Sequence, residues 1–365
     1  MRAIRWVPCV MAGMLVSMSA AFGAEWGLKE GTPELKSAGP LAFGPDGILF
    51  VGDAKGATVF AIGTGDTKDD PSKVAINVSG LNAKVAELLG VNADKIAIND
   101  LAVNPLNGNV FLSVSKAGSA TLVKVAADGK LSQVGLQKVL MQKIELPNAP
   151  EDKEVETKRG KANLRSQSIT DIAYAEGKVY VSGVAGGSPS NVREIPFPFT
   201  DANVGTSVEI YHAAHGRLED NAVVRTFLPI NIDGEASLLA GFTCTPLVKF
   251  PVNTLKPGEK TRGTTVAELG NMNQPLDMIV YQKEGQSFLL MANNKRGVMK
   301  ITTEGITKNP GLTEPVRGGG VAGQTYETIK ELEGVVQLDK LNSTHAVIVV
   351  QSPSGSQDLR TIALP

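Results

Sequence analysis

Cysteine is scarce in this chain, which has only two among its 365 residues. Cys9 lies in an apolar stretch near the N-terminus, so the remainder of the chain contains Cys244 alone. A single thiol cannot form an intrachain disulfide, and no Cys-x-x-Cys-His segment offers a c-type haem attachment site. Stability must therefore come from an apolar core.

Aromatic residues and an excess of either charge are also lacking. Aromatics make up 5% of the chain, and 36 basic residues face 37 acidic ones. Nucleic-acid binding requires a basic surface, so no nucleic-acid partner is predicted. The abundance of glycine, 39 residues, favours many turns between short strands over long helices.

Residues 1–23 have the pattern of a signal peptide. Arg2 and Arg5 give a basic start, residues 6–18 are mostly apolar, and an Ala-Phe-Gly segment supplies a small-x-small cleavage site. The apolar part is too short for a membrane span, and no long apolar run follows it. We expect export to the periplasm or the medium, with no integral membrane segment after signal removal and a single domain over 24–365.

A strand–turn–strand unit recurs along the rest of the chain. Its first strands start near Leu41, Leu101, Ile172, Phe227, Met278 and Val335. These starts are 60, 71, 55, 51 and 57 residues apart. Four-stranded units at this period predict an all-β fold, a β-propeller with six blades. Seven blades are the alternative, because the long gap after Leu41 could contain irregular strands.

Several segments fall outside this unit. The last copy has only three strands, and residues 32–38 are predicted to supply the fourth and close the ring as an N-terminal strand. Residues 81–90 have helical apolar spacing that ends at a glycine, which predicts a helical insert. Residues 148–166 are charged and aperiodic, which predicts a solvated surface loop. Weaker apolar segments are predicted as the outermost strands of the units that they follow: 73–78, 136–146, 207–213 and 264–269.

Three of the units begin with an aspartate: Asp100, Asp171 and Asp277. In a propeller, the innermost strands all start on one face, beside the central channel. The turn between the second and third strands returns to that face. Residues in these turns are therefore expected near the same channel mouth: Asp53, Cys244, Asn293, Asn294 and Lys295.

The recurring aspartates have two interpretations. Carboxylate and amide oxygens suit a hard cation, so Asp100, Asp171 and Asp277, with Asn99 and Asn293, predict a metal site for which Ca²⁺ is the candidate ion. Alternatively, aspartates at strand starts hydrogen-bond backbone N–H groups in turns, and the repeat alone explains their recurrence.

The histidines and the remaining cysteine offer less. His212 and His215 lie in a segment predicted as an outer strand that ends at Gly216, where an odd offset sends side chains to opposite faces. A two-histidine metal site is therefore not predicted. Cys244 is interpreted as a small buried apolar residue, with a nucleophile or soft-metal ligand as the alternative.

Two segments, NDLAVNPLNGNVFLSV (99–114) and GPLAFGPDGILFVGD (39–53), resemble blades of the NHL-repeat and gluconolactonase-like (SMP-30-type) six-bladed propellers. The resemblance implies a channel cation held by Glu, Asn and Asp, and hydrolysis of lactones or phosphoesters. Asn99 and Asp100 match this ligand set, and Asn293 matches it more loosely. The glutamate of an early Glu-Gly-Pro in the family is Ala38 here.

The sequence thus predicts a binding or scaffold protein that acts through its channel-mouth face on a protein or small-molecule partner. The alternative is a metal-dependent hydrolase of the lactonase- or phosphoesterase-like class. No positioned acid or base stands out, so the sequence does not assign an enzyme. A quinone-dependent dehydrogenase is not predicted, because Trp26, the single tryptophan after residue 23, lies outside the repeat.

Overall fold

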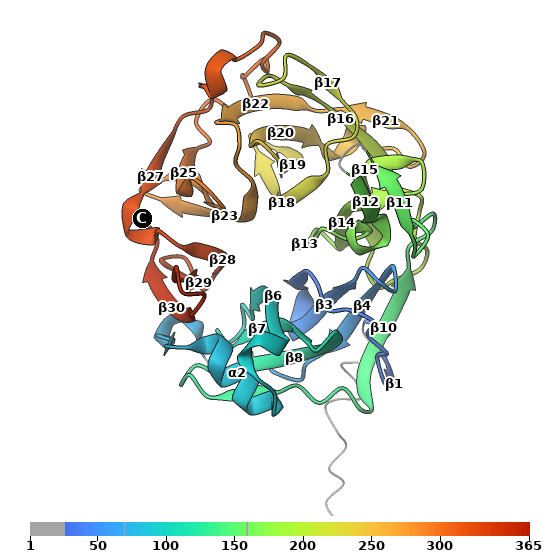
Figure 1. Ribbon diagram of the computed structural model, residues 1–365, viewed down its shortest axis with the longest axis vertical. Helices are drawn as coiled ribbons and strands as arrows, with labels where there is room; N and C mark the ends of the chain where they lie inside the picture. The colour runs from blue at the N-terminus through green and yellow to red at the C-terminus, as the bar shows by residue number, and fades with distance from the viewer. Residues whose placement is uncertain (1–25, 69, 158–159) are drawn as a thin grey trace, which may run out of the picture.

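The computed structural model describes residues 26–68, 70–157 and 160–365. The expected signal peptide, 1–23, lies outside these residues. Six sheets, antiparallel except for one outer-edge pair, surround a central channel, and each presents one innermost strand to that channel (Figure 1). The innermost strands are β2 (Leu41–Phe43), β6 (Ile96–Val103), β13 (Asp171–Ala175), β18 (Val224–Ile232), β23 (Pro275–Lys283) and β28 (Val335–Lys340). The predicted six-bladed β-propeller is confirmed, and the seven-bladed alternative is wrong.

Each blade continues outward through two more long strands. The second strands are β3 (Ile48–Asp53), β7 (Val110–Lys116), β14 (Lys178–Ala185), β19 (Glu235–Phe242), β24 (Gln286–Asn293) and β29 (His345–Gln351). The third strands are β4 (Thr58–Gly63), β8 (Ser119–Val125), β15 (Ser188–Pro196), β20 (Pro246–Pro251), β25 (Gly297–Thr302) and β30 (Gln357–Ala363). Their near-continuous apolar sequences follow from burial on both faces between neighbouring blades.

One apolar layer fills each junction between blades, and alternate residues of a strand belong to different layers. Ile48 and Phe50 of β3 pack in one layer with Ile172 of the third blade. Leu49 and Val51 pack in another layer with residues of the second blade. All four β3 side chains are fully buried, and such burial stabilises the fold by about 1.5–3 kcal/mol per large side chain.

The blades do not follow one another around the ring in chain order. The first blade lies between the second and the third, because β2 contacts both β6 and β13. The second blade lies between the sixth and the first, because β28 contacts β6. The order around the channel is therefore sixth, second, first, third, fourth, fifth (Figure 1).

Because of this order, the outermost strands of the first and sixth blades come from distant segments of the chain. β10 (Val139–Glu145) pairs with β4 and completes the first blade, although it follows the second blade in sequence. β5 (Asn77–Val78) pairs with β30 and completes the sixth blade. The predicted assignment of 136–146 to the second unit and of 73–78 to the first is therefore wrong. Sequence proximity does not decide pairing when the chain crosses to another blade before it returns.

The ring is closed by a strand from the N-terminal part of the chain, as predicted, but the strand is β5 and not residues 32–38. The segment before the first blade instead forms β1 (Lys29–Gly31), which pairs with β10. Thr361 and Ile76 exchange hydrogen bonds beside the β5–β30 pair, with the Thr361 hydroxyl accepting from Ile76 N at 2.9 Å.

The chain from β5 to the second blade contains α2 (Leu81–Leu89), the position at which the sequence predicts a helix. Leu81, Val85 and Leu89 face a layer shared by the second and sixth blades. Gly90 ends the helix at φ 67°, where its N–H bonds the carbonyl of Ala86, as expected of a glycine beyond a helix end.

Residues 148–166 are not wholly a loop. They contain a hairpin of β11 (Glu154–Thr157) and β12 (Gly160–Asn163), separate from the six blades. Glu156 lies opposite Lys161 in this pair, and opposite charges across a pair favour the ladder even in a polar sequence. The predicted surface loop is therefore corrected to a surface hairpin followed by a short 3₁₀ helix, η4 (Leu164–Gln167).

Further strands complete the outer edges of the remaining sheets. The fourth strands are β9 (Leu131–Gln133), β16 (Thr206–His212), β22 (Thr264–Leu269) and β27 (Tyr326–Ile329). Further edge strands are β17 (Arg217–Glu219), β21 (Lys260–Arg262) and β26 (Val321–Gly323). Within the described ranges, no helix has both the length and the apolar character needed to cross a membrane.

Candidate functional site

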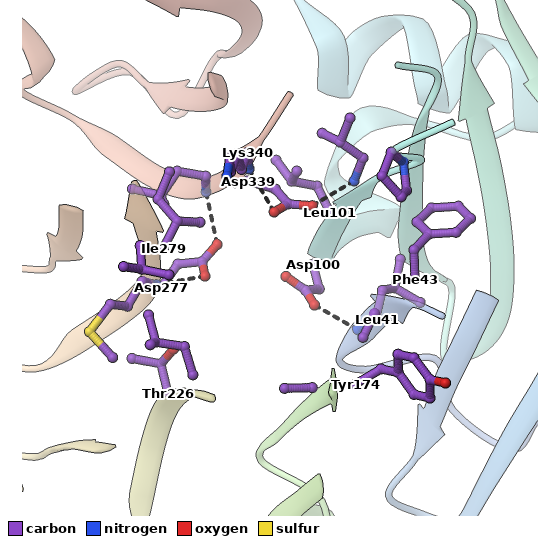
Figure 2. A pocket seen from close by; sticks show the side chains of 18 of the residues that line it. Leu41, Phe43, Asp100, Leu101, Tyr174, Thr226, Asp277, Ile279, Asp339 and Lys340 are labelled. Carbon is purple, nitrogen blue, oxygen red and sulfur yellow. Dashed lines mark hydrogen bonds between the residues drawn. The ribbon is translucent and has the colours of Figure 1, made fainter. Parts of the chain in front are cut away.

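The central channel contains the three predicted aspartates. Asp100, Asp171 and Asp277 together line a narrow cavity of about 140 Å³, here called the waist. A wider cavity of about 620 Å³, here called the vestibule, continues from the same carboxyls along the later residues of the innermost strands (Figure 2). A third cavity of about 490 Å³ opens on the face where these strands start.

A fourth aspartate that the sequence analysis missed, Asp339, lines the vestibule with them. It belongs to the sixth unit, whose first strand, β28, reads VVQLDK. When the innermost strands are aligned, Gln337 occupies the position at which three other blades have Asp100, Asp171 and Asp277. Asp339 is shifted by two residues, which keeps it on the same side of the strand. The signal was therefore present but out of register.

Each of the four carboxylates accepts a hydrogen bond from a backbone N–H of the neighbouring blade. The pairs are Asp100 with Leu41, Asp171 with Phe227, Asp277 with Leu338 and Asp339 with Val103, at O···N distances of 2.7, 2.7, 2.8 and 2.7 Å. A hydrogen bond of this kind contributes about 0.5–1.5 kcal/mol, and more while the carboxyl is ionised. These aspartates therefore join blades at the channel.

The carboxylates also bond their own strands. Asp171, Asp277 and Asp339 each accept the N–H of the following residue, at 2.8, 2.8 and 2.6 Å. The interpretation that aspartates bond their own backbone is therefore correct for these three residues, but it does not include their bonds to the neighbouring blade. At the two junctions without an inter-blade aspartate, the corresponding positions are Pro40 and Thr226.

Burial raises the pKa of every one of these carboxyls. It raises the pKa of Asp171 to about 7, against the lowering effect of the hydrogen bond from Phe227 N. It raises the pKa of Asp339 to about 6. For Asp100 and Asp277, burial and the nearby carboxylates together hold the pKa well above its usual range. Protons can therefore relieve the repulsion among these groups near neutral pH.

The vestibule walls are mostly apolar, and its rim is polar. Phe43 and Tyr174 contribute aromatic surface, and Lys340 lies beside Asp339 (Figure 2). Phe227 also lines the cavity. A cavity of this volume with a few polar groups is typical of small-molecule sites. The arrangement can accept a molecule with an apolar body and a polar end.

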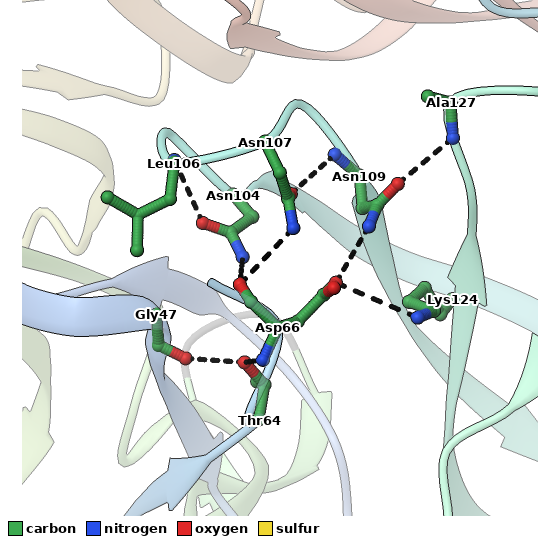
Figure 3. Close-up of polar contacts among 9 residues, drawn as sticks. All are labelled: Gly47, Thr64, Asp66, Asn104, Leu106, Asn107, Asn109, Lys124 and Ala127. Carbon is green, nitrogen blue, oxygen red and sulfur yellow. Dashed lines mark hydrogen bonds and ion pairs between the residues drawn. The ribbon is translucent and has the colours of Figure 1, made fainter. Parts of the chain in front are cut away.

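An asparagine cluster fixes the loops at the junction of the first and second blades (Figure 3). Asn104 and Asn107 donate to the carbonyl oxygen of Asp66, at 2.6 and 3.2 Å. The Asp66 carboxylate accepts from Asn109 at 2.8 Å and pairs with Lys124 at 3.7 Å. These contacts hold the segment after β4 against the first turn of the second blade, next to the vestibule rim.

Asn99 and Asp53 are occupied by contacts within the fold. The Asn99 side-chain amide donates to Ala38 O at 2.7 Å and to Ser115 Oγ at 2.9 Å. The fully buried Asp53 carboxylate accepts from Lys36 N, Ser37 N and Gly56 N, each at 2.8 Å. Asp53 therefore anchors the segment before the first blade to the β3–β4 turn.

The β24–β25 turn holds the start of β23 in place. Asn293 Oδ1 accepts from Asn273 Nδ2 at 3.0 Å, Asn294 Oδ1 accepts from Gln274 N at 2.9 Å, and Lys295 N donates to Asn273 Oδ1 at 3.2 Å. Gln274 lines the open mouth of the channel. These turn residues therefore shape the mouth indirectly, through the 273–274 segment.

The expectation that His212 and His215 point to opposite faces is wrong. β16 ends at His212, and the chain turns before Gly216, so the two imidazole centroids lie 3.9 Å apart. Cys244, in the β19–β20 turn, lies near them; contrary to expectation, it does not line the channel cavities and is half-buried instead of fully buried. Among the described residues, these three are the group of His, Cys, Asp or Glu side chains whose ligand atoms lie within 4.8 Å of one another. The channel aspartates do not form such a group.

Solved β-propeller structures resemble the chain. The PQQ-bound aldose sugar dehydrogenase of Streptomyces coelicolor is 12% identical over 92% of this chain and 97% of that chain, with a TM-score of 0.35. A streptogramin B lyase is 10% identical over 93% and 99%, with a TM-score of 0.34. The WD40 propeller domain of Doa1 is 9% identical over 92% and 95%, also with a TM-score of 0.34. Likenesses at this level carry no argument about activity.

No protein-family model and no curated protein sequence matches the chain. The resemblance to NHL-repeat and SMP-30-type propellers therefore stays an expectation from the sequence, while the propeller fold is established by the sheets themselves.

Proposed function

We propose that this protein binds a small molecule in the vestibule, with the apolar part of the ligand against the walls and a hydrogen-bonding end toward the aspartates. The observation that carries the proposal is a cavity of about 620 Å³ whose walls are mostly apolar and into which four carboxyls converge. Binding sites for small molecules typically combine such walls with a few placed polar groups.

The chemistry of the carboxyls favours a ligand with amine or hydroxyl donors. Each Asp171 oxygen already accepts one backbone N–H, and a carboxylate oxygen has a second lone pair free for a ligand. A cationic amine would favour the ionised carboxylates, and a hydroxyl could exchange hydrogen bonds with a protonated one. An anionic ligand would be repelled by the ionised members of the set.

A calorimetric screen of alkylamines and polyols tests this proposal. We expect one-to-one binding that weakens at least tenfold in Ser343→Trp, because Ser343 is an exposed residue on the vestibule rim. Ser354→Trp is the matched control, since Ser354 lies in the other hairpin turn of the same blade, outside the cavity linings. Absence of binding by every compound, or equal weakening by both variants, would contradict the proposal.

A metal-dependent hydrolase is the second candidate, because Asn99 lines the waist beside the carboxyls of Asp100, Asp171 and Asp277. If these residues bind Ca²⁺, millimolar Ca²⁺ should raise the melting temperature, and Asp100→Asn and Asp277→Asn should abolish the rise. Turnover of a lactone or phosphoester in the presence of Ca²⁺ would favour the hydrolase. An unchanged melting temperature without turnover would favour the binding protein.

We also propose that the protein is exported, on the basis of the basic start, apolar stretch and small-x-small segment in residues 1–23. The expected mature N-terminus lies near Ala24. N-terminal sequencing of the protein recovered from the periplasm or medium tests this, and an intact N-terminus in the cytoplasmic fraction would contradict it.

A further inference from the structure

We propose that His212, His215 and Cys244 form a binding site for a borderline or soft metal ion, Zn²⁺ or Cu⁺, at the outer junction of the third and fourth blades. One ring nitrogen of each histidine and the Cys244 sulfur lie within 4.8 Å of one another. The site is distinct from the channel, because its residues come from the end of β16 and from the β19–β20 turn.

A single carboxylate orients both imidazoles. Glu219 Oε2 lies 2.8 Å from His212 Nδ1, and Glu219 Oε1 lies 2.8 Å from His215 Nδ1. A carboxylate that accepts at Nδ1 places the ring proton there and leaves the Nε2 lone pair free. Metal-binding histidines commonly donate their other ring nitrogen to a carboxylate in this way, which fixes the tautomer and the ring orientation.

The second ring nitrogen of His212, Nε2, makes no hydrogen bond within the described residues. The His212 side chain is 3% exposed, and Nε2 is buried. An unpaired buried polar atom destabilises the fold, and a bound cation would remove that penalty. The arrangement thus contains an oriented, desolvated lone pair beside a second imidazole and a thiol.

A second carboxyl, Glu268, adjoins the site, the Arg217 guanidinium balances Glu219 at 3.0 Å, and one side of the site is open to solvent. Glu268 is fully buried, its Oε1 accepts from Ala214 N at 3.1 Å, and its Oε2 lacks a partner among the described residues. Ala214 lies between the two histidines in sequence, so this carboxyl stands next to the site. The His215 side chain is 42% exposed, which leaves one side of the site open to an arriving ion.

The ligand types select the ion. Two imidazoles and a thiolate suit Zn²⁺ and Cu⁺, whereas Ca²⁺ and Mg²⁺ prefer oxygen ligands. Zinc binds nitrogen at about 2.0–2.1 Å and sulfur at about 2.3 Å with tetrahedral geometry. Such an ion would draw together side chains that are already neighbours, and a fourth position would remain for water. Binding requires the Cys244 thiol to release its proton to solvent, so that the thiolate coordinates the ion.

Metal titration of the purified protein in a Cys9→Ser background, where Cys244 is the sole thiol, tests the site. We expect one Zn²⁺ per chain, a thiolate-to-metal charge-transfer band with Co²⁺ as the optical probe for zinc, and at least tenfold slower reaction of Cys244 with a disulfide reagent when Zn²⁺ is present. A separate titration against a chromogenic Cu⁺ chelator measures Cu⁺, and the two affinities decide which ion the site prefers. Ca²⁺ should produce none of these signals.

Variants separate this site from general metal adsorption. His215→Ala and Cys244→Ser should lose stoichiometric binding, and Glu219→Gln should weaken it by about 10–100-fold. His345→Ala, which alters the remaining histidine of the chain in the sixth blade, should bind as the parent does. Because His215 is partly exposed, its variant is expected to keep the parental circular dichroism spectrum, which separates loss of ligand from loss of fold.

Binding of neither Zn²⁺ nor Cu⁺ by the parent would overturn the proposal, as would binding that His215→Ala and Cys244→Ser leave unchanged. The test is independent of the vestibule, because Ser343→Trp should retain metal binding whatever it does to a small-molecule ligand.

Discussion

The pH dependence of stability should report directly on the buried carboxyl of Asp171. Its pKa is raised from 3.8 to about 7, chiefly by burial. A pKa that is higher in the folded than in the unfolded state means that the native protein retains the proton at higher pH. The stabilisation is therefore complete below about pH 4 and is lost as pH rises through about 7. Linkage gives a loss of about 1–3 kcal/mol between pH 5 and pH 8, the lower part of the range allowing for water in the channel.

Asp171→Asn removes this titration while it keeps a side-chain oxygen that can accept from Phe227 N. We expect the difference in unfolding free energy between pH 5 and pH 8, measured by urea denaturation, to shrink by about 1–3 kcal/mol relative to the parent. Asp128→Asn is the matched control, because Asp128 lies in an exposed turn where its oxygen accepts from Lys130 N. If Asp171→Asn and the parent have the same pH dependence, the carboxyl is not desolvated as described and the reasoning fails.

Three further predictions concern the fold. Arg193→Met should leave urea stability unchanged or raise it by about 1–4 kcal/mol, because Arg193 is fully buried with two unpartnered nitrogens among the described atoms; a loss above 1 kcal/mol would refute this. Gly183→Ala should lower stability by about 1–3 kcal/mol, since its Cβ would lie 2.2 Å from a backbone oxygen. Gly135→Ala, with nothing within 4 Å of its Cβ, should have little effect, and equal effects would contradict the packing argument. Asp358→Ala should speed amide hydrogen exchange at Gly80, whose N–H bonds the Asp358 carboxylate at 2.8 Å; unchanged exchange would refute that contact.

The innermost and second strands could be predicted from the sequence because local features specify them. Strands such as β3 are apolar without interruption and are bounded by turn residues, and burial on both faces requires that pattern. Two-residue strands such as β5 carry almost no local signal. β5 gains its role from a partner, β30, that lies about 280 residues further along the chain, and no periodicity in either segment encodes that pairing.

The candidate sites show the same division. The recurrence of Asp100, Asp171 and Asp277 revealed that they share the channel, because one position in the repeat maps to one position in the fold. The metal site depends instead on where β16 ends. If β16 continued through His215, the two side chains would point to opposite faces of the strand. The strand instead ends at His212, and the turn before Gly216 brings the two rings together. That boundary, and the approach of Cys244 from another blade, are tertiary facts.

The recurring aspartate is explained by geometry around the ring and not by succession along the chain. Asp171 reaches the blade that follows it in sequence, whereas Asp100 reaches the blade that precedes it. Both nevertheless point in the same sense around the channel, because the first two blades have exchanged places. To form its inter-blade hydrogen bond, each such aspartate therefore requires only that the adjacent blade present an unpaired backbone N–H to it. A ligand is not needed to account for the repeat, so evidence for a vestibule ligand must come from binding. Since the same carboxyls join blades and face the vestibule, a cationic ligand that ionises them would lower their pKa values and alter the pH dependence that Asp171 imposes.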